Sequence, residues 1–157
     1  MVLWVNGGPG SSSMFGLFLE NGPIRVGRIP GKKLDDLDNF QVKFAKNMGS
    51  PDGDWSELAD LVYIDQPVGT GFSFGDELNT RLEQGSDDLI RFIYKLYEMY
   101  PEYKTRPLYI TGESYGGKYL PSLATSILKE NCKSNPAEVR INLKAALIGD
   151  PYASPVR

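Results

Sequence analysis

An apolar run, a Gly-x-Ser-x-Gly pentapeptide and a helical pattern follow one another directly in the second half of the chain. Leu108–Thr111 has the composition of a short buried strand, and the residues from Gly116 to about Asn131 have that of a helix. The pentapeptide between them must then turn so tightly that a Cβ at Gly112 or Gly116 would collide with neighbouring backbone. Such a turn lifts the hydroxyl of Ser114 above the sheet edge and leaves the next N–H free to bind an anionic oxygen.

This strand, turn and helix together are typical of the nucleophile elbow of α/β-hydrolases, with Ser114 as the nucleophile. The predicted fold class is therefore α/β, an α/β-hydrolase fold with an open, mostly parallel sheet and flanking helices. A second match to the pattern occurs at Gly71–Gly75, but five residues separate it from the preceding strand and no apolar helix follows it directly. We therefore expect Ser73 to be a loop residue near the site.

Hydrophobic periodicity and turn residues place the remaining elements. Strands are predicted at Val2–Val5, Leu61–Asp65 (buried) and Leu143–Ile148, with half-exposed strands at Ile24–Val26 and Phe40–Ala45. A compact apolar turn or helix is predicted at Met14–Leu19, a long helix from about Thr80 to Tyr100, and surface loops at Gly27–Asn39 and Lys46–Asp54. The alternation of strands and helices near the end of the chain implies parallel pairing with right-handed crossovers, in a sheet that is incomplete at its C-terminal end.

Each of the two longest helices has an apolar stripe at steps of three and four residues, which predicts the face that it buries. On the first helix the stripe consists of Leu89, Phe92, Ile93, Leu96 and Tyr100. On the second helix it consists of Leu120, Leu123, Ala124, Ile127 and Leu128. Pro101 marks the end of the first helix, because proline cannot continue it.

The chain contains no histidine, although a serine nucleophile on this fold takes its proton acceptor from a histidine that follows an aspartate. The chain also begins within a predicted strand, without the positive-then-apolar pattern of a secretory signal. We therefore expect residues 1–157 to be the N-terminal part of a longer hydrolase. By themselves they should turn over no substrate, and their incomplete sheet should expose an edge that aggregates.

Composition and charge exclude several other classes of function. The net charge of −3 provides no basic patch for nucleic acid, and no apolar run approaches the ~20 residues that span a bilayer. A single cysteine, Cys132, allows no internal disulfide, and we expect it to be a thiol without a role at a helix end. Because no His/Cys cluster has the spacing of metal ligands, neither a metal nor an organic cofactor is implied.

Three sequence blocks carry a resemblance to a known family. They are Trp4–Ser13, which contains the Gly-Gly-Pro-Gly loop, Asp65–Ser73, and Gly112–Gly117. In order and spacing they resemble the signature blocks of the serine carboxypeptidase family, and the similarity covers nearly the whole chain apart from about Gly27 to Asp54. Two further segments, Met14–Phe18 and Ile141–Asp150, are similar to the vitellogenic-like branch of that family.

The resemblance implies catalytic roles for three matching positions. Ser114 would be the nucleophile that is acylated, and the N–H groups of Gly8 and Tyr115 would form the oxyanion hole. The residues support the same interpretation independently, because acyl transfer needs one donor just after the nucleophile and a second from an early glycine-rich loop.

Four other matching positions would recognise the substrate. The resemblance implies that Asn6, Glu20 and Glu113 bind the free carboxylate at the C-terminus of a peptide, and that Trp4 braces this network. Two carboxyl groups held close together cannot both ionise, so one keeps its proton to higher pH and can donate a hydrogen bond to a carboxylate. Without the resemblance, Glu20 would be interpreted as an exposed acid before an Asn-Gly turn.

Residues 1–157 are thus predicted to be a partial α/β-hydrolase domain of a serine-type carboxypeptidase, which releases C-terminal amino acids from peptides and proteins. Its partner would be a peptide or protein C-terminus, and by resemblance its location would be the lysosome or vacuole, or outside the cell. The oligomeric state is left open. Two alternatives remain, an acyltransferase on the same scaffold and a non-catalytic binding protein. The presence of Glu20 and Glu113 argues mildly for a peptide substrate and against the acyltransferase.

Three departures from the family pattern qualify this prediction. Ser11 stands where the family commonly has a cysteine that often forms a disulfide, and Lys118 stands where histidine is frequent. Asp150 and Pro151 replace the end of a common Gly-Asn-Gly sequence. Because proline fixes φ and lacks an N–H, this departure affects the local geometry around Asp150.

Overall fold

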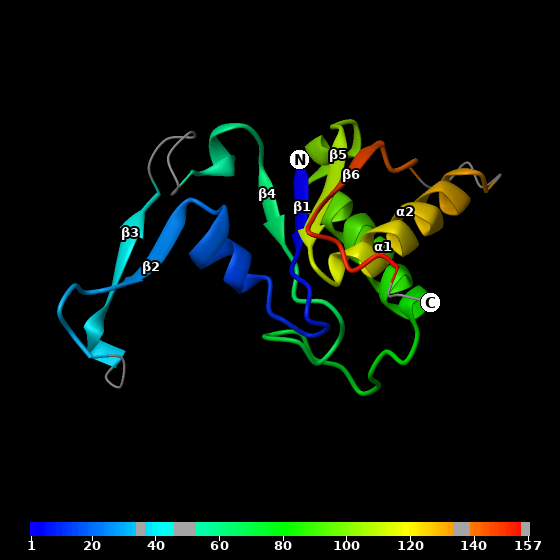
Figure 1. The fold of residues 1–157 in the computed structure, drawn as a ribbon. Coiled ribbons are helices and arrows are strands. Elements are labelled where there is room, and N and C mark those ends of the chain that lie inside the picture. Colours follow the sequence, from blue (N-terminus) through cyan, green and yellow to red (C-terminus); the bar gives the residue numbers. More distant parts are fainter. Residues whose placement is uncertain (34–36, 46–52, 134–138, 155–157) are drawn as a thin grey trace.

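The computed structural model describes residues 1–33, 37–45, 53–133 and 139–154 (Figure 1). Its strands are β1 (Val2–Val5), β2 (Ile24–Arg28), β3 (Phe40–Phe44), β4 (Leu61–Tyr63), β5 (Leu108–Glu113) and β6 (Leu143–Gly149). Its α-helices are α1 (Leu82–Met99) and α2 (Gly116–Asn131), and short helical turns occur at Gly16–Glu20, Leu37–Asn39, Trp55–Glu57 and Pro101–Lys104. The predicted strands, the two long helices and the turn after Met14 are therefore confirmed, with small shifts of their ends.

The main sheet has the strand order β4-β1-β5-β6, and every neighbouring pair is parallel. Helices α1 and α2 pack against each other on one side of this sheet (Figure 1). The core lies between the sheet and these helices, and its fully buried side chains include Leu3, Val5, Ile93, Tyr97, Leu108, Ile110, Leu120, Leu123 and Ile127. Because β1 and β5 are the central pair, the loops that leave their carboxyl ends emerge side by side, as in other open parallel sheets.

The buried faces of the helices differ in part from the predicted stripes. In α1 the buried residues are Leu89, Ile90, Ile93 and Tyr97, whereas Phe92 is 36% exposed and Tyr100 is 47% exposed. The prediction that Tyr100 belongs to the buried face of α1 was wrong. Tyr100 lies just after the end of the helix, and its φ of −131° is not helical. In α2 the prediction holds for the central residues, but Leu128 is 60% exposed because it lies on the flank of the stripe near the helix end.

Strand β4 is shorter and less buried than predicted. It ends at Tyr63, and its residues are half-buried because β4 lies at the edge of the sheet with only β1 beside it. Ile64 still donates its N–H to the carbonyl oxygen of Trp4 at 3.3 Å. Asp65 has left the strand, but its side chain is buried in the loop that follows.

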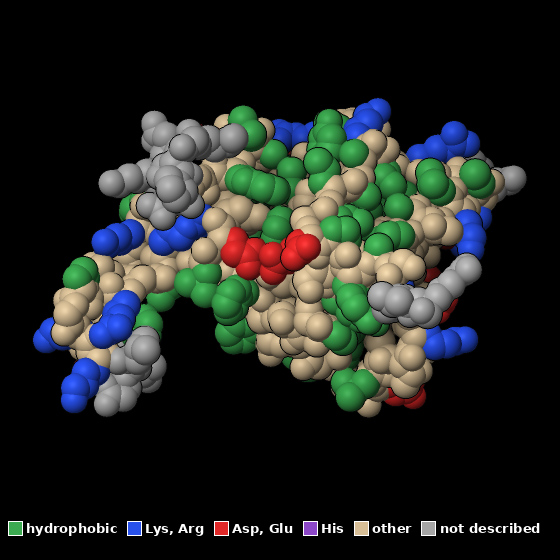
Figure 2. Space-filling view, viewed as in Figure 1, with side chains coloured by type: hydrophobic (Ala, Val, Ile, Leu, Met, Phe, Trp, Pro, Cys, Tyr) green, Lys and Arg blue, Asp and Glu red, His purple; other side chains and the backbone are tan. Residues whose placement is uncertain are grey.

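The second sheet is an antiparallel hairpin of β2 and β3, which projects from the main sheet (Figure 1). Its register pairs Ile24 with Phe44 and Val26 with Val42. Lys and Arg side chains gather on this projecting end of the molecule (Figure 2). The loop predicted at Gly27–Asn39 begins later than expected, because residues 27 and 28 belong to β2. Residues 34–36 of this loop and residues 46–52 of the second predicted loop lie outside the described residues.

The helices of the described ranges include none that combines the length and the hydrophobicity needed to cross a bilayer. Cys132 is a free, exposed thiol that caps the C-terminus of α2, as predicted for a thiol at a helix end. Within the same ranges, no three Cys, Asp or Glu side chains gather closely enough to hold a metal ion.

Candidate active site

The turn between β5 and α2 holds Ser114 in an unusual backbone conformation. Its φ is +50°, in the left-handed region that residues with a side chain rarely adopt. Two hydrogen bonds fix it there: the N–H of Ser114 donates to the carbonyl oxygen of Gly149 at 3.0 Å, and its own carbonyl accepts from the N–H of Tyr152 at 2.7 Å. The side of the turn that carries Ser114 is exposed, whereas the glycines that flank the turn at 112 and 116 are buried. The sequence prediction of a tight, exposed serine turn is therefore confirmed.

The glycines of the turn are required for different reasons than predicted. A Cβ on Gly112 would lie 2.3 Å from the carbonyl oxygen of Val5 in the neighbouring strand, so this collision was correctly predicted. A Cβ on Gly116 would have no neighbour closer than 3.7 Å, so the collision predicted there was wrong. The crowded position is the next one, since a Cβ on Gly117 would lie 3.0 Å from the backbone nitrogen of Tyr152.

The glycine-rich loop after β1 lies directly against this turn. A Cβ on Gly7 would be 2.6 Å from the backbone nitrogen of Tyr115 and 2.8 Å from the Cβ of Ser114, so only glycine permits this approach. Gly8 follows at once, is exposed and has a φ of +110°. The structure thus brings the start of the glycine-rich loop, at Gly7, against the backbone of Ser114 and Tyr115, which are far away in sequence. The reason is the pairing of β1 with β5, in which Val5 is opposite Gly112.

The four residues predicted to recognise the substrate are joined by hydrogen bonds around one amide. The side-chain nitrogen of Asn6 lies 3.0 Å from Oε1 of Glu20 and 3.0 Å from Oε1 of Glu113. Its side-chain oxygen accepts from Nε1 of Trp4 at 2.8 Å and from the backbone N–H of Gly16 at 3.1 Å. Asn6 is 2% exposed, so every hydrogen-bonding position of its amide is used inside the protein.

Burial raises the pKa of the Glu20 carboxyl above its ordinary value, and the nearby carboxyl of Glu113 raises it further. The hydrogen bond from Asn6 and the charge of Arg25 act in the opposite direction. The guanidinium of Arg25 is itself held by backbone carbonyl oxygens, including that of Gly22 at 2.7 Å. Figure 2 shows an acidic cluster near the middle of the visible face, bordered by hydrophobic side chains. A carboxyl that keeps its proton in such a place can act as a hydrogen-bond donor.

Asp65 lies near the site, and the sequence analysis missed its importance. It is 7% exposed, and its carboxylate accepts hydrogen bonds from residues of two different loops. One feature of the sequence could have indicated this role. Asp65 is an acidic residue just after β4, and β4 is parallel to β1, which is followed by the glycine-rich loop. Ser73 is confirmed as a loop residue, since its hydroxyl donates to the backbone carbonyl of Asp65 at 2.7 Å.

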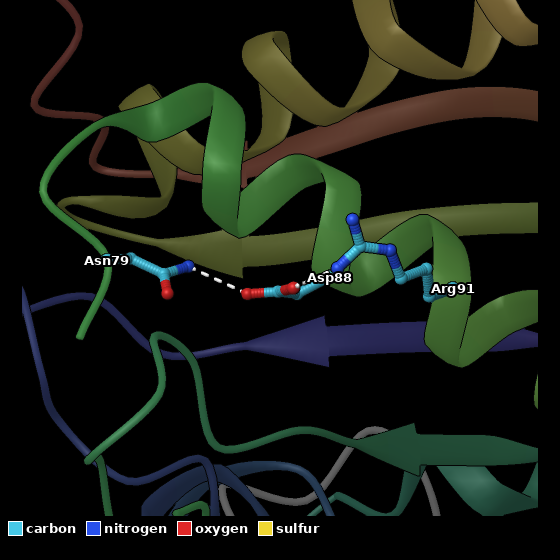
Figure 3. Close-up of polar contacts among 3 residues, drawn as sticks. All are labelled: Asn79, Asp88 and Arg91. Atoms are coloured by element: carbon cyan, nitrogen blue, oxygen red, sulfur yellow. Dashed lines mark hydrogen bonds and ion pairs between the residues drawn. The ribbon is translucent and has the colours of Figure 1, made fainter. Parts of the chain in front are cut away.

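A pocket of about 230 Å³ opens beside the turn, and Tyr115 forms part of its wall. The wall also includes Asn79, whose side chain points toward Asp88 of α1 in Figure 3. Its side-chain nitrogen donates to Asp88 at 2.9 Å, and Asp88 also pairs with Arg91 at 3.1 Å. The loop on this side of the pocket is therefore fixed to the helix.

The segment after β6 closes the other side of the turn. Asp150 adopts a φ of +41°, and the chain bends there before Pro151. The ring of Tyr152 then stacks on that of Tyr115, with ring centres 6.0 Å apart. The ammonium group of Lys118 donates to the backbone carbonyl oxygen of Ala153 at 2.6 Å. Tyr152 and Lys118 thus form contacts that hold this segment against the turn.

Comparison with known proteins gives one consistent result. The family model described as serine carboxypeptidase matches residues 1–157. The pheromone-processing carboxypeptidase KEX1 of Candida albicans (strain SC5314) is 40% identical over 154 residues, which are 98% of this chain and 20% of that protein. The protein of the same name from Tuber melanosporum is 42% identical over 156 residues, 98% of this chain and 22% of that protein. The chain therefore spans about a fifth of the length of these relatives.

A solved structure shares the fold. It is that of KEX1(delta)P, described as a prohormone-processing carboxypeptidase from Saccharomyces cerevisiae, with a TM-score of 0.77 and 34% sequence identity. The match covers 96% of this chain and 30% of that one. The α/β-hydrolase fold predicted from the strand, turn and helix around Ser114 is thereby confirmed.

Proposed function

Because the chain belongs to the serine carboxypeptidase family, we propose that Ser114 is the nucleophile of a serine-type carboxypeptidase that releases C-terminal amino acids from peptides and proteins. The observation that carries this proposal is the carboxyl pair of Glu20 and Glu113 on the amide of Asn6. Glu113 directly precedes Ser114, so the network that would hold the terminal carboxylate lies beside the group that would attack the last peptide bond.

In the proposed reaction, the hydroxyl oxygen of Ser114 attacks the carbonyl carbon of the last peptide bond. The bond to the terminal amino acid breaks, that amino acid leaves with a proton on its nitrogen, and water later hydrolyses the acyl-enzyme. The negative oxygen formed on attack would be held by the N–H groups of Gly8 and Tyr115. Loss of one such donor costs about 3 kcal/mol in the transition state.

The proton acceptor for Ser114 is not among these 157 residues, which contain no histidine. We therefore propose that residues 1–157 act as part of a larger hydrolase domain, in which a histidine and an aspartate from additional sequence complete the site. The proposal is supported by the length of the relatives, of which this chain covers 20 to 22% in the two examples above.

In the proposed binding step, the carboxyl of Glu20 carries a proton and donates a hydrogen bond to the terminal carboxylate of the substrate. The raised pKa of Glu20 supports this step, because it extends the protonated form to higher pH. Trp4 would keep the amide of Asn6 in place, and its ring meets that of Trp55 edge to face at 5.6 Å. A neutral peptide end, such as an amide, would gain nothing from a charge-assisted bond of this kind.

We further propose a location in the lysosome or vacuole, or outside the cell, which rests on the family alone. The placement in the vitellogenic-like branch also stays a hypothesis, supported by the segments Met14–Phe18 and Ile141–Asp150. The relatives described above are instead named KEX1 and processing carboxypeptidases.

The test uses the full-length protein and a pair of peptides that differ only in a free or an amidated C-terminus. We expect release of the terminal amino acid from the free acid only, and we expect Ser114→Ala to abolish it. An equal rate on the amide would argue against recognition of the carboxylate. The acyltransferase alternative would be favoured if the protein transferred an acyl group from an activated ester and cleaved no peptide. The non-catalytic alternative would be favoured if the protein bound the peptide without turnover.

A further inference from the structure

Asp65 joins the two loops that border the proposed oxyanion site. Its Oδ1 accepts a hydrogen bond from the hydroxyl of Ser12 at 2.6 Å and one from the backbone N–H of Ser13 at 2.7 Å. Its Oδ2 accepts from the backbone N–H of Phe72 at 2.8 Å. The carboxylate is buried, so these neutral donors take the place of water around its charge.

Further hydrogen bonds of Ser13 connect the two ends of the glycine-rich loop. Ser13, at its end, donates its hydroxyl to the carbonyl oxygen of Ile64 at 2.5 Å and accepts from the backbone N–H of Asn6, at its beginning, at 3.0 Å. Inside the loop, the N–H of Ser11 donates to the carbonyl oxygen of Gly7 at 3.1 Å. Gly7 is the residue that touches the backbone of the serine turn, so a continuous set of contacts runs from Asp65 to the turn.

The carboxylate has little room to move. A Cβ on Gly71 would lie 2.2 Å from Oδ2 of Asp65 and 2.8 Å from the hydroxyl of Ser12. An asparagine at position 65 would keep this shape, but one of its two polar atoms would be an NH₂ group. That group would face a backbone N–H or a hydroxyl that now donates, and a buried donor would lose its acceptor.

We propose that Asp65 is a positioning residue for the reaction: it holds the loop of Asn6–Ser13 so that the N–H of Gly8 stays directed at the oxygen that becomes negative on attack. This inference rests on the proposed function. Asp65 lies outside the substrate site and acts only through the loop, so it should affect the transition state more than the binding of the peptide end.

The test compares full-length Asp65→Asn and Ser12→Ala with the unchanged enzyme, with all rates expressed per titrated active serine. We expect kcat/KM to fall about 10- to 100-fold in Asp65→Asn and about 3- to 10-fold in Ser12→Ala. Affinity for a peptide boronic acid, whose tetrahedral adduct occupies the oxyanion site, should fall in the same proportion. Because rates are counted per active site, misfolded molecules do not contribute to the loss, and Ser12→Ala keeps the test open if Asp65→Asn does not fold.

The matched control is Asp60→Asn, the same change at the opposite end of β4, where Asp60 is exposed and pairs with Arg106. It should leave kcat/KM unchanged. Unchanged kcat/KM in both Asp65→Asn and Ser12→Ala would overturn the inference, and so would a fall in kcat/KM without a matching loss of boronate affinity. Failure of the proposed function would look different, since Ser114→Ala would then keep the activity of the unchanged enzyme.

Discussion

Glu20 and Glu113 approach the same atom, each with a carboxyl oxygen 3.0 Å from the side-chain nitrogen of Asn6. One residue comes from the helical turn after the glycine-rich loop and the other from the end of β5. Because burial and the neighbouring acid raise the pKa of Glu20, its carboxyl can hold a proton at a pH where a free glutamate would have lost it. This relationship leads to the first two predictions.

The first prediction concerns the pH dependence of peptide binding. A raised carboxyl pKa keeps the donor form below that pKa and removes it as the pH rises through it, so KM for a free-acid peptide should increase between about pH 4 and pH 8. In Glu20→Gln the donor is present at every pH, so the profile should be flatter. Steady-state kinetics of both enzymes check this, and a flat profile of the unchanged enzyme would contradict it.

The second prediction concerns stability in the same pH range. A carboxyl whose pKa is raised by folding contributes stability that is fully present below its unfolded pKa and is lost as the pH rises through its folded pKa. The glutamine variant at position 20 loses this dependence. Denaturant unfolding should therefore show the variant gaining stability relative to the unchanged protein as the pH rises toward neutrality. A constant difference between the two at all pH values would show that Glu20 does not titrate in this way.

The third prediction concerns Asn6 itself. Asn6→Ala would leave the buried N–H groups of Trp4 and Gly16 without their acceptor and would remove the group that holds the two acids together. Each unsatisfied buried donor costs about 1 to 3 kcal/mol, so the two together should lower the free energy of unfolding by about 2 to 6 kcal/mol. Thermal and denaturant unfolding measure it, with Asn142→Ala as control, because the half-buried Asn142 donates its side-chain N–H to the carbonyl oxygen of Thr105 in a hydrogen bond that is exposed to solvent.

The sequence was most informative where one local pattern determines the geometry. The serine turn could be predicted because an apolar strand, two glycines and a helix leave few ways to connect them, and the helix after it has the predicted bounds, Gly116–Asn131. The roles of Asn6 and Glu113 needed the family resemblance, because nothing local shows that their side chains meet. That contact depends on the pairing of β1 with β5, which brings residues 6 and 113 together across more than a hundred positions.

Errors arose where tertiary contacts decide. Phe92 and Leu128 fit the helical period, but each lies on the flank of its stripe, and only the position of the neighbouring helix and strands determines which flank is covered. Asp65 was taken as the end of a strand, because its three donors come from loops whose paths the sequence does not reveal. The expected crowding at Gly116 failed for the same reason, since the strand opposite approaches Gly112 instead.

That difference between two glycines gives the last prediction, a matched pair of substitutions in one turn. In Gly112→Ala the new methyl would be 2.3 Å from the carbonyl oxygen of Val5, so β1 and β5 would have to separate, and a loss of about 3 kcal/mol or more is expected. In Gly116→Ala the methyl has no neighbour closer than 3.7 Å and stands at the first position of α2, where alanine favours the helix by up to about 1 kcal/mol. Unfolding of the two variants should therefore differ in sign as well as size. Equal destabilisation by both substitutions would mean that the turn tolerates no Cβ at either flank, as the sequence alone had suggested. The close approach of β1 to Gly112 would then not be the reason why the turn requires glycine.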